Sequence, residues 1–189
     1  MHTSIGTTLT HRLALPRTRK VDFALSLVCS LFIAIAAQVS FRVPFSPVPI
    51  TGQTFAILVV AAIFGRQRAV QSVLLYLAEG FAGLPVFAGG GAGITWLLGP
   101  TGGYLGGFVL AAALVGHLSD RGHVRHVMDT LVVFAAGHLV IYLTGVVWLS
   151  VFTGLEAAIQ LGILPFLMGD MCKISLAAIT LPATRRKLE

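Results

Sequence analysis

Two oppositely charged side chains interrupt a long apolar segment near the end of the chain. Asp170 and Lys173 lie within residues 157–181, and a helix needs about 20 apolar residues to cross a bilayer. Each charge would cost about 2.5–3.5 kcal/mol at the centre of a lipid-facing helix, so such groups usually face a bundle interior or a wet cavity. At positions i and i+3 the two side chains share one helical face and can reach each other or a common ligand. The pair is therefore either an ion pair that joins helices or a site for a polar solute. In such a site Lys173 would take an anion and Asp170 would accept a hydrogen bond.

The composition is typical of an integral membrane protein. Of the 189 residues, 56% are hydrophobic and only 11% are charged, whereas soluble domains average about 25% charged residues. The net charge of +6 could suggest nucleic-acid binding, but the basic residues lie at the chain ends and in short loops, as topology signals do. Cys29 and Cys172 both fall in apolar segments and lack the spacing of metal ligands. We therefore expect no disulfide, no metal site, no cofactor and no nucleic-acid partner.

The apolar segments predict an all-α fold: a polytopic membrane protein with a six-transmembrane-helix bundle and an extracytoplasmic lid formed by loops. The first apolar segment could be a signal peptide, but its length favours a retained span. The expected helices cover residues 21–43, 51–64, 69–84, 100–118, 128–152 and 157–181.

Two irregular segments are expected to cover one end of the bundle. Residues 43–50 hold three prolines, which fix φ and remove donors, so this segment should be extended. Thr51 follows as the expected N-cap of the second helix. Residues 83–103 are rich in glycine, and irregular backbone inside a membrane is tolerated only against protein or a cavity. We interpret this second segment as a re-entrant or lid-like loop.

The basic residues predict the orientation. Six spans place both termini on one side, together with eleven of the thirteen basic residues. Arg42 alone lies on the other side, and Lys173 is in the sixth helix. By the positive-inside rule both termini are cytoplasmic, so the lid faces outward. The expected organisation is a cytoplasmic basic tail (1–20), a transmembrane substrate-binding domain (21–182) and a second cytoplasmic basic tail (183–189).

Three polar or small-residue features each have two interpretations. Glu79 is either an interfacial residue in contact with water or a ligand contact. His138 is more often a hydrogen-bonded packing residue than a proton relay. Ser26, Ser30 and Ala34 recur every four residues, and this small-residue stripe can pack inside the bundle or against a partner helix.

Five blocks of sequence stand out in order along the chain: residues 47–54 (PVPITGQT), 76–77 (YL), 83–90 (GLPVFAGG), 99–105 (GPTGGYL) and 168–173 (MGDMCK). Together they resemble the BioY family, the biotin-binding S components of energy-coupling factor (ECF) vitamin transporters. The resemblance spans residues 21–181 and implies a substrate-capture subunit in a prokaryotic cytoplasmic membrane. It also implies a biotin pocket that faces outward, a transmembrane coupling subunit and cytoplasmic ATPase subunits as partners.

The resemblance and the chemistry of biotin together define a candidate site. The valerate carboxylate suits Lys173, and an N–H of the ureido ring suits Asp170; which polar group meets which end stays open. The resemblance also favours docking of the stripe of Ser26, Ser30 and Ala34 onto the coupling subunit. Further candidate contacts are Thr51 and Gln53 for the ureido group, Tyr76, Phe87 and Tyr104 for an apolar wall, and Gly90 in the lid.

Two other functions are considered. An intramembrane enzyme is disfavoured because we find no nucleophile elbow, no HExxH and no paired intramembrane aspartates. The chain also has no GxxxxGK[ST], so ATP hydrolysis is expected from partner subunits. The other candidate is a self-sufficient biotin transporter that works without the ATPase module, and the sequence is compatible with it.

Overall fold

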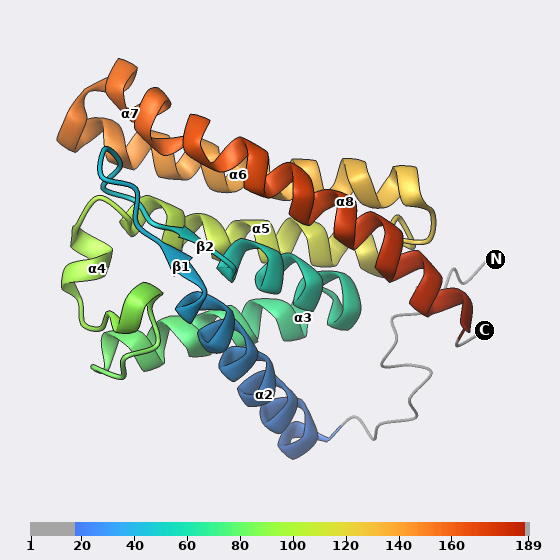
Figure 1. Ribbon diagram of the computed structural model, residues 1–189. Helices are drawn as coiled ribbons and strands as arrows, with labels where there is room; N and C mark the ends of the chain where they lie inside the picture. The colour runs from blue at the N-terminus through green and yellow to red at the C-terminus, as the bar shows by residue number, and fades with distance from the viewer. Residues whose placement is uncertain (1–17, 188–189) are drawn as a thin grey trace.

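The structure is a computed structural model that describes residues 18–187, with side chains described through residue 182. In this part of the chain, five segments are long and apolar enough to cross a membrane. They comprise α2 (Arg19–Gln38), α3 (Gln53–Phe81), α5 (Gly102–Asp120), α6 (Val127–Thr153) and the consecutive helices α7 (Leu155–Gly162) and α8 (Leu164–Lys187), which together form one segment (Figure 1). Short elements complete the fold: β1 (Ser40–Phe41), β2 (Ile50–Thr51), the 3-10 turn η1 (Ala88–Gly90) and α4 (Thr95–Leu98).

Helix α3 is a hairpin of two antiparallel arms. Gly65 lies inside it with φ of +78°, a left-handed conformation that favours glycine. On opposite arms, Gln53 donates a hydrogen bond to the Tyr76 hydroxyl, although 23 residues of straight helix would separate them by roughly 35 Å. The bundle therefore has six crossings, which confirms the predicted six-helix fold.

The two arms of α3 occupy the centre of the bundle. They pack against α2 on one side and α5 on the other, α5 packs against α6, and α6 packs against α7 and α8 (Figure 1). Small side chains allow this close packing: Ala56, Ala61 and Ala111 are fully buried. The predicted sixth helix is interrupted at Ile163, where the backbone leaves helical geometry and separates α7 from α8.

A small hairpin and the glycine-rich segment cover one end of the bundle. Strands β1 and β2 pair in antiparallel register, and the proline-rich segment forms the connection between them. Ser46 in this connection donates to the Leu161 carbonyl of α7 (2.8 Å), so the segment reaches across the end of the bundle as expected. The N-cap position of α3 is Gly52, one residue later than predicted. Thr51 nevertheless accepts a hydrogen bond from the Gln53 backbone N–H (3.3 Å).

The small-residue stripe of α2 faces α3. Ser26, Ser30 and Ala34 are buried, with exposed fractions of 4%, 0% and 8%. Ser30 also donates to a carboxylate oxygen of Glu79 in α3 (2.9 Å). The interpretation of this stripe as a docking surface is therefore corrected: it packs inside the bundle, which was the alternative. The physical reason is that small side chains on α2 allow the backbone of α3 to approach closely.

The ends of the chain differ in part from the predicted tails. Most of the predicted N-terminal tail, residues 1–17, lies outside the described residues. Arg19 and Lys20, which were assigned to that tail, form the first turn of α2. Helix α8 continues through the predicted boundary at residue 182 to Lys187.

Candidate functional site

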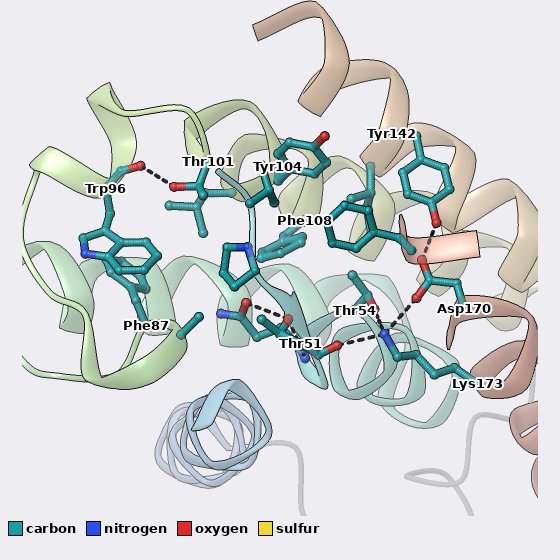
Figure 2. A pocket seen from close by; sticks show the side chains of 17 residues that line it. Thr51, Thr54, Phe87, Trp96, Thr101, Tyr104, Phe108, Tyr142, Asp170 and Lys173 are labelled. Carbon is teal, nitrogen blue, oxygen red and sulfur yellow. Dashed lines mark hydrogen bonds and ion pairs between the residues drawn. The ribbon is translucent and has the colours of Figure 1, made fainter. Parts of the chain in front are cut away.

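A cavity lies beneath the lid, enclosed by the hairpin, the glycine-rich segment and four helices (Figure 2). Its wall is apolar over most of its extent, and its polar groups gather where α3, α6 and α8 meet. The polar lining residues are Thr51, Gln53, Thr54, Thr101, Tyr142, Asp170 and Lys173. The others are Val48, Pro49, Phe87, Ala88, Trp96, Tyr104, Leu105, Phe108, Ile141 and Phe166.

Six of the eight predicted substrate-binding residues line this cavity: Thr51, Gln53, Phe87, Tyr104, Asp170 and Lys173. Tyr76 does not, because it is fully buried behind Phe87, whose ring packs edge-on against it at 5.6 Å between centroids. Gly90 does not either. Its backbone N–H points to the Gln38 side chain (3.0 Å) at the end of α2. These two residues support the wall and the lid rather than line the cavity.

Lys173 directs all three of its ammonium donors at protein oxygens. The acceptors are the Asp170 carboxylate (2.7 Å), the Thr51 carbonyl (2.8 Å) and the Thr54 hydroxyl (3.2 Å) (Figure 2). The Thr51 carbonyl is available because the chain passes from β2 into α3 at this point. An ammonium group has three N–H donors, so this arrangement uses its full capacity. Lys173 thus joins α8 to the start of α3 and neutralises Asp170.

Asp170 is the centre of the polar cluster. It is buried, with an exposed fraction of 4%, and its second oxygen accepts a hydrogen bond from the Tyr142 hydroxyl of α6. His138, one turn before Tyr142, places Nε2 3.6 Å from Asp170 Oδ1. Each carboxylate oxygen has two lone pairs. Asp170 therefore keeps acceptor capacity for a ligand after its contacts with Lys173 and Tyr142.

The two other polar residues singled out in the sequence lie outside the cavity lining. His138 is buried and its Nδ1 lies 2.9 Å from the Phe134 carbonyl, which can only accept, so Nδ1 carries a proton. His138 therefore packs beside Asp170 without lining the cavity. This position agrees with its interpretation as a hydrogen-bonded packing residue. Glu79 binds Ser30 between α2 and α3 and does not touch the cavity.

Aromatic rings form the apolar wall. Phe87 packs against Trp96 with 5.9 Å between ring centroids, and Tyr104 packs against Phe166 at 6.4 Å. Phe87 fits because Gly80 has no side chain: a Cβ there would overlap the Phe87 ring. The Tyr104 hydroxyl donates to the Gly162 carbonyl (2.8 Å) at the end of α7, so its hydroxyl is already engaged. The wall offers stacking surface for an apolar ring or chain.

Several lining residues were not predicted from the sequence. Thr54 and Tyr142 complete the polar cluster, and Trp96, Phe108 and Phe166 complete the aromatic wall. Thr54 lies in the first resemblance block, and Tyr142 lies one helical turn from His138. These two positions were the only features of the sequence that could have identified Thr54 and Tyr142 as lining residues.

The geometry suits a ligand with a compact, donor-rich polar end and an apolar body. Among residues 18–182, no group of three His, Cys, Asp or Glu side chains is placed to hold a metal ion. The described lining offers hydrogen-bonding groups, one neutralised ion pair and apolar surface.

Comparison with known proteins gives consistent matches over nearly the whole chain. The sequence profile of the BioY family matches residues 7–189. The probable biotin transporter BioY of Pyrococcus horikoshii is 40% identical over 153 residues, which cover 79% of this chain and 89% of that protein. Biotin transporter BioY2 of Lactococcus lactis is 35% identical over 162 residues, covering 83% and 87%.

A solved structure shares the fold. The crystal structure of the S-component for biotin from an ECF-type ABC transporter superposes with a TM-score of 0.80. The match covers 92% of this chain and 95% of that chain, at 26% sequence identity.

Proposed function

This chain belongs to the BioY family, and we propose that it captures biotin and serves its uptake as the substrate-specific subunit of an ECF-type transporter. It is a multi-pass membrane protein of a transporter family. Matches to biotin transporters and to a biotin S-component agree on one ligand. The alternative, transport by this chain alone, has no observation in its favour beyond those that also support the subunit role.

The observation that carries this proposal is the polar cluster around Asp170 at the end of an aromatic cavity. The ureido ring of biotin has two N–H donors and one carbonyl. Asp170 has free acceptor capacity for an N–H. Thr54 accepts from Lys173, which leaves its own hydroxyl proton to donate to the ureido carbonyl. Gln53 lies beside them as a further polar contact.

This geometry favours the ureido end of biotin, rather than its carboxylate, at the polar cluster. The charges of Asp170 and Lys173 cancel at 2.7 Å, and the three donors of Lys173 are all engaged. A carboxylate placed here would face the Asp170 oxygens without a free cation to bind. The sequence left this question open and suggested Lys173 for the carboxylate. We propose instead that Lys173 holds Asp170 in place.

The rest of biotin would lie along the aromatic wall. Its thiophane ring and alkyl chain are apolar and match the surface formed by Phe87, Trp96 and Phe108. Burial of apolar surface yields about 25 cal/mol per Å², so this wall would supply much of the affinity while the polar cluster supplies specificity.

We further propose that the lid faces outward, that both termini are cytoplasmic and that the membrane is the cytoplasmic one. Arg19 and Lys20 start α2, Arg66 and Arg68 follow the kink of α3, and Arg121 follows α5, all at the end away from the lid (Figure 1). This distribution follows the positive-inside rule. ATP hydrolysis and the coupling movement would come from partner subunits, which dock on a surface other than the buried stripe of α2.

Equilibrium binding of labelled biotin to the purified protein in lipid nanodiscs tests the proposed function. We expect saturable binding that unlabelled biotin displaces and that riboflavin, a vitamin of different chemistry, does not. A monodisperse, thermally cooperative protein that binds no biotin would contradict the proposal. Displacement by riboflavin would contradict the specificity that we assign to the polar cluster.

A further inference from the structure

The placement of biotin proposed above leaves its carboxylate without a partner inside the cavity. Among the lining residues Lys173 is the only cation, and its donors are engaged by Asp170, Thr51 and Thr54. If the ureido ring lies at the polar cluster, the valerate chain extends along the wall toward the lid. An anionic carboxylate is poorly placed against apolar surface, so a cation at the mouth would stabilise it.

A second hollow adjoins the cavity on the lid side. It is lined by Arg42, Val43, Pro44, Ser46, Pro47, Pro49 and Trp96. Pro49 and Trp96 line both spaces, so the outer hollow and the cavity meet at these two side chains. A ligand that leaves the cavity between them enters a space whose single charged lining residue is Arg42.

Arg42 lies where it can serve this mouth. It directly follows β1, and its side chain is exposed. One guanidinium nitrogen, Nη2, lies 3.7 Å from the point where a Cβ of Gly89 would stand, so the side chain rests against the turn η1 of the lid. Arg42 makes no hydrogen bond or ion pair with any described residue. Its donors therefore remain available for a ligand.

Arg42 also stands apart from the other basic residues. The remaining cations of residues 18–182, apart from Lys173, lie at the opposite end of the bundle (Figure 1). The positive-inside bias keeps cations away from the lid side, so an arginine there runs against the topology signal. If Arg42 were only a solvated loop residue, its exposure would be explained. Its position beside Pro49 and Trp96, which line both the cavity and the outer hollow, would not.

We propose that Arg42 forms a carboxylate subsite at the mouth of the cavity and binds the valerate carboxylate of biotin. This inference rests on the proposed function. The guanidinium presents its N–H donors in a planar fork that matches a carboxylate in bidentate geometry. Because the site is open to water, the interaction is screened and contributes modestly to affinity. The same charge attracts the anionic vitamin to the mouth before it binds.

The test compares two ligands on two proteins. Biotin and its primary amide differ only in the charged end, so the carboxylate subsite should distinguish them. We expect the wild type to bind biotin about threefold to fivefold more tightly than the amide, as an exposed ion pair would give. Arg42→Gln should remove this difference by weakening biotin while leaving the amide unchanged. Added salt should reduce the difference in the wild type and have no such effect in the variant.

Two control variants separate the effect of the position of Arg42 from the effect of losing one positive charge. Arg19→Gln removes the same charge at the exposed start of α2 and should leave both affinities unchanged. Arg42→Lys keeps the charge and should retain most of the preference for biotin. Unchanged amide binding by Arg42→Gln also shows that the variant is folded.

The outcomes separate the subsite from the proposed function. If the wild type binds biotin and Arg42→Gln keeps the same preference over the amide, the subsite is wrong and the function stands. An equal loss of both ligands in Arg42→Gln would assign Arg42 to lid structure and overturn the subsite. A wild type that binds neither ligand overturns the proposed function itself, and the subsite with it.

Discussion

At Asp170, side chains from two helices converge and explain how a carboxylate is kept inside a membrane bundle. Lys173 neutralises it, Tyr142 donates to it, and His138 lies behind it. An uncompensated charge at this depth would cost several kcal/mol, so the pair has to be arranged as a unit. We therefore propose that the pair has a structural role and a binding role at once, and the two roles can be separated by experiment.

Substitutions of the pair should reduce stability and binding in different ways. Asp170→Asn and Lys173→Ala should each weaken biotin binding at least tenfold, or ~1.4 kcal/mol. Lys173→Ala should also lower the free energy of unfolding by about 3 kcal/mol, because Asp170 is left buried and unpaired. The double variant Asp170→Asn/Lys173→Met should recover stability relative to Lys173→Ala but not biotin affinity. Thermal unfolding and equilibrium binding in the same nanodiscs measure both quantities.

Unchanged biotin binding in both folded single variants would assign the pair to structure alone. Biotin binding that recovers in the double variant would also assign the pair to structure alone, because this variant lacks both charges.

The sequence could predict those site residues whose presence in an apolar segment is itself unusual. Asp170 and Lys173 are identified by their desolvation cost, whatever packs around them. Whether Tyr76 lines the cavity depends on which residue packs between it and the cavity. In the structure the ring of Phe87 lies there. Thr54 and Tyr142 lie 119 and 31 residues before Lys173, and only the packing of α3, α6 and α8 brings them to one cluster. Such convergence cannot be read from local spacing.

At the scale of elements, the kink at Gly65 gives α3 its shape. The sequence predicted two separate helices, 51–64 and 69–84, whereas the reversal needs only Gly65 itself. The backbone N–H of Arg66, freed by the break, binds the Asp120 carboxylate at 3.0 Å. The number of membrane crossings could be predicted from the lengths of the apolar segments. The tight reversal between the two arms of α3, in contrast, depends on the contact between Arg66 and Asp120 of α5.

Gly65→Ala should destabilise the protein by about 2 kcal/mol or more. Left-handed geometry costs a residue with a Cβ about 1–2 kcal/mol, and the added methyl group would also overlap the Asp120 carboxylate. Gly106→Ala is the matched control, because it lies within α5 with open space at its Cβ position, and it should be neutral or stabilising. Thermal unfolding in detergent compares the two. Equal melting temperatures for both variants would contradict the role that we assign to Gly65.

Helix α2 is linked to the cavity wall through its last residue. The Gln38 amide nitrogen lies 3.2 Å from the Phe87 carbonyl, and its oxygen accepts from the Gly90 N–H at 3.0 Å. A displacement of α2 against α3 would therefore move the lid segment that carries Phe87. The four-residue spacing of the small residues was visible in the sequence, but which neighbouring helix they face depends on the packing of α2 against α3.

Ala34→Trp should lower both the melting temperature and the affinity for biotin. Ala34 is 8% exposed against α3, so the indole would force the two helices apart, and overpacking of this kind costs about 1–3 kcal/mol. Ile35→Trp serves as the control because Ile35 is 69% exposed on the outer face of the same helix. An Ala34→Trp variant with unchanged stability and binding would show that the stripe faces outward.

On the scale of the whole molecule, the two ends of the bundle differ in chemistry. The lid end holds the cavity, the proline-rich connection and the glycine-rich segment, whereas the far end holds most of the charged side chains. Some of these are paired: Arg68 binds Asp22 at 2.6 Å and so ties α2 to α3. The proposed role as a substrate-capture subunit would use this asymmetry, because the ligand would arrive from one side and the proposed energy source would lie on the other. The charge bias and the position of the cavity thus point to the same orientation.

That orientation predicts where fused reporters will work. A fluorescent reporter that folds only in the cytoplasm should be active when fused after Glu189, since basic segments remain on the cytoplasmic side. The same reporter inserted after Phe45, in the exposed connection between β1 and β2, should be silent, whereas a phosphatase active only outside the cytoplasm should work there. Immunoblotting controls for expression of each fusion. A stably expressed but dark C-terminal fusion would reverse the orientation, and the cavity would then open toward the cytoplasm, where it could not collect biotin from outside the cell.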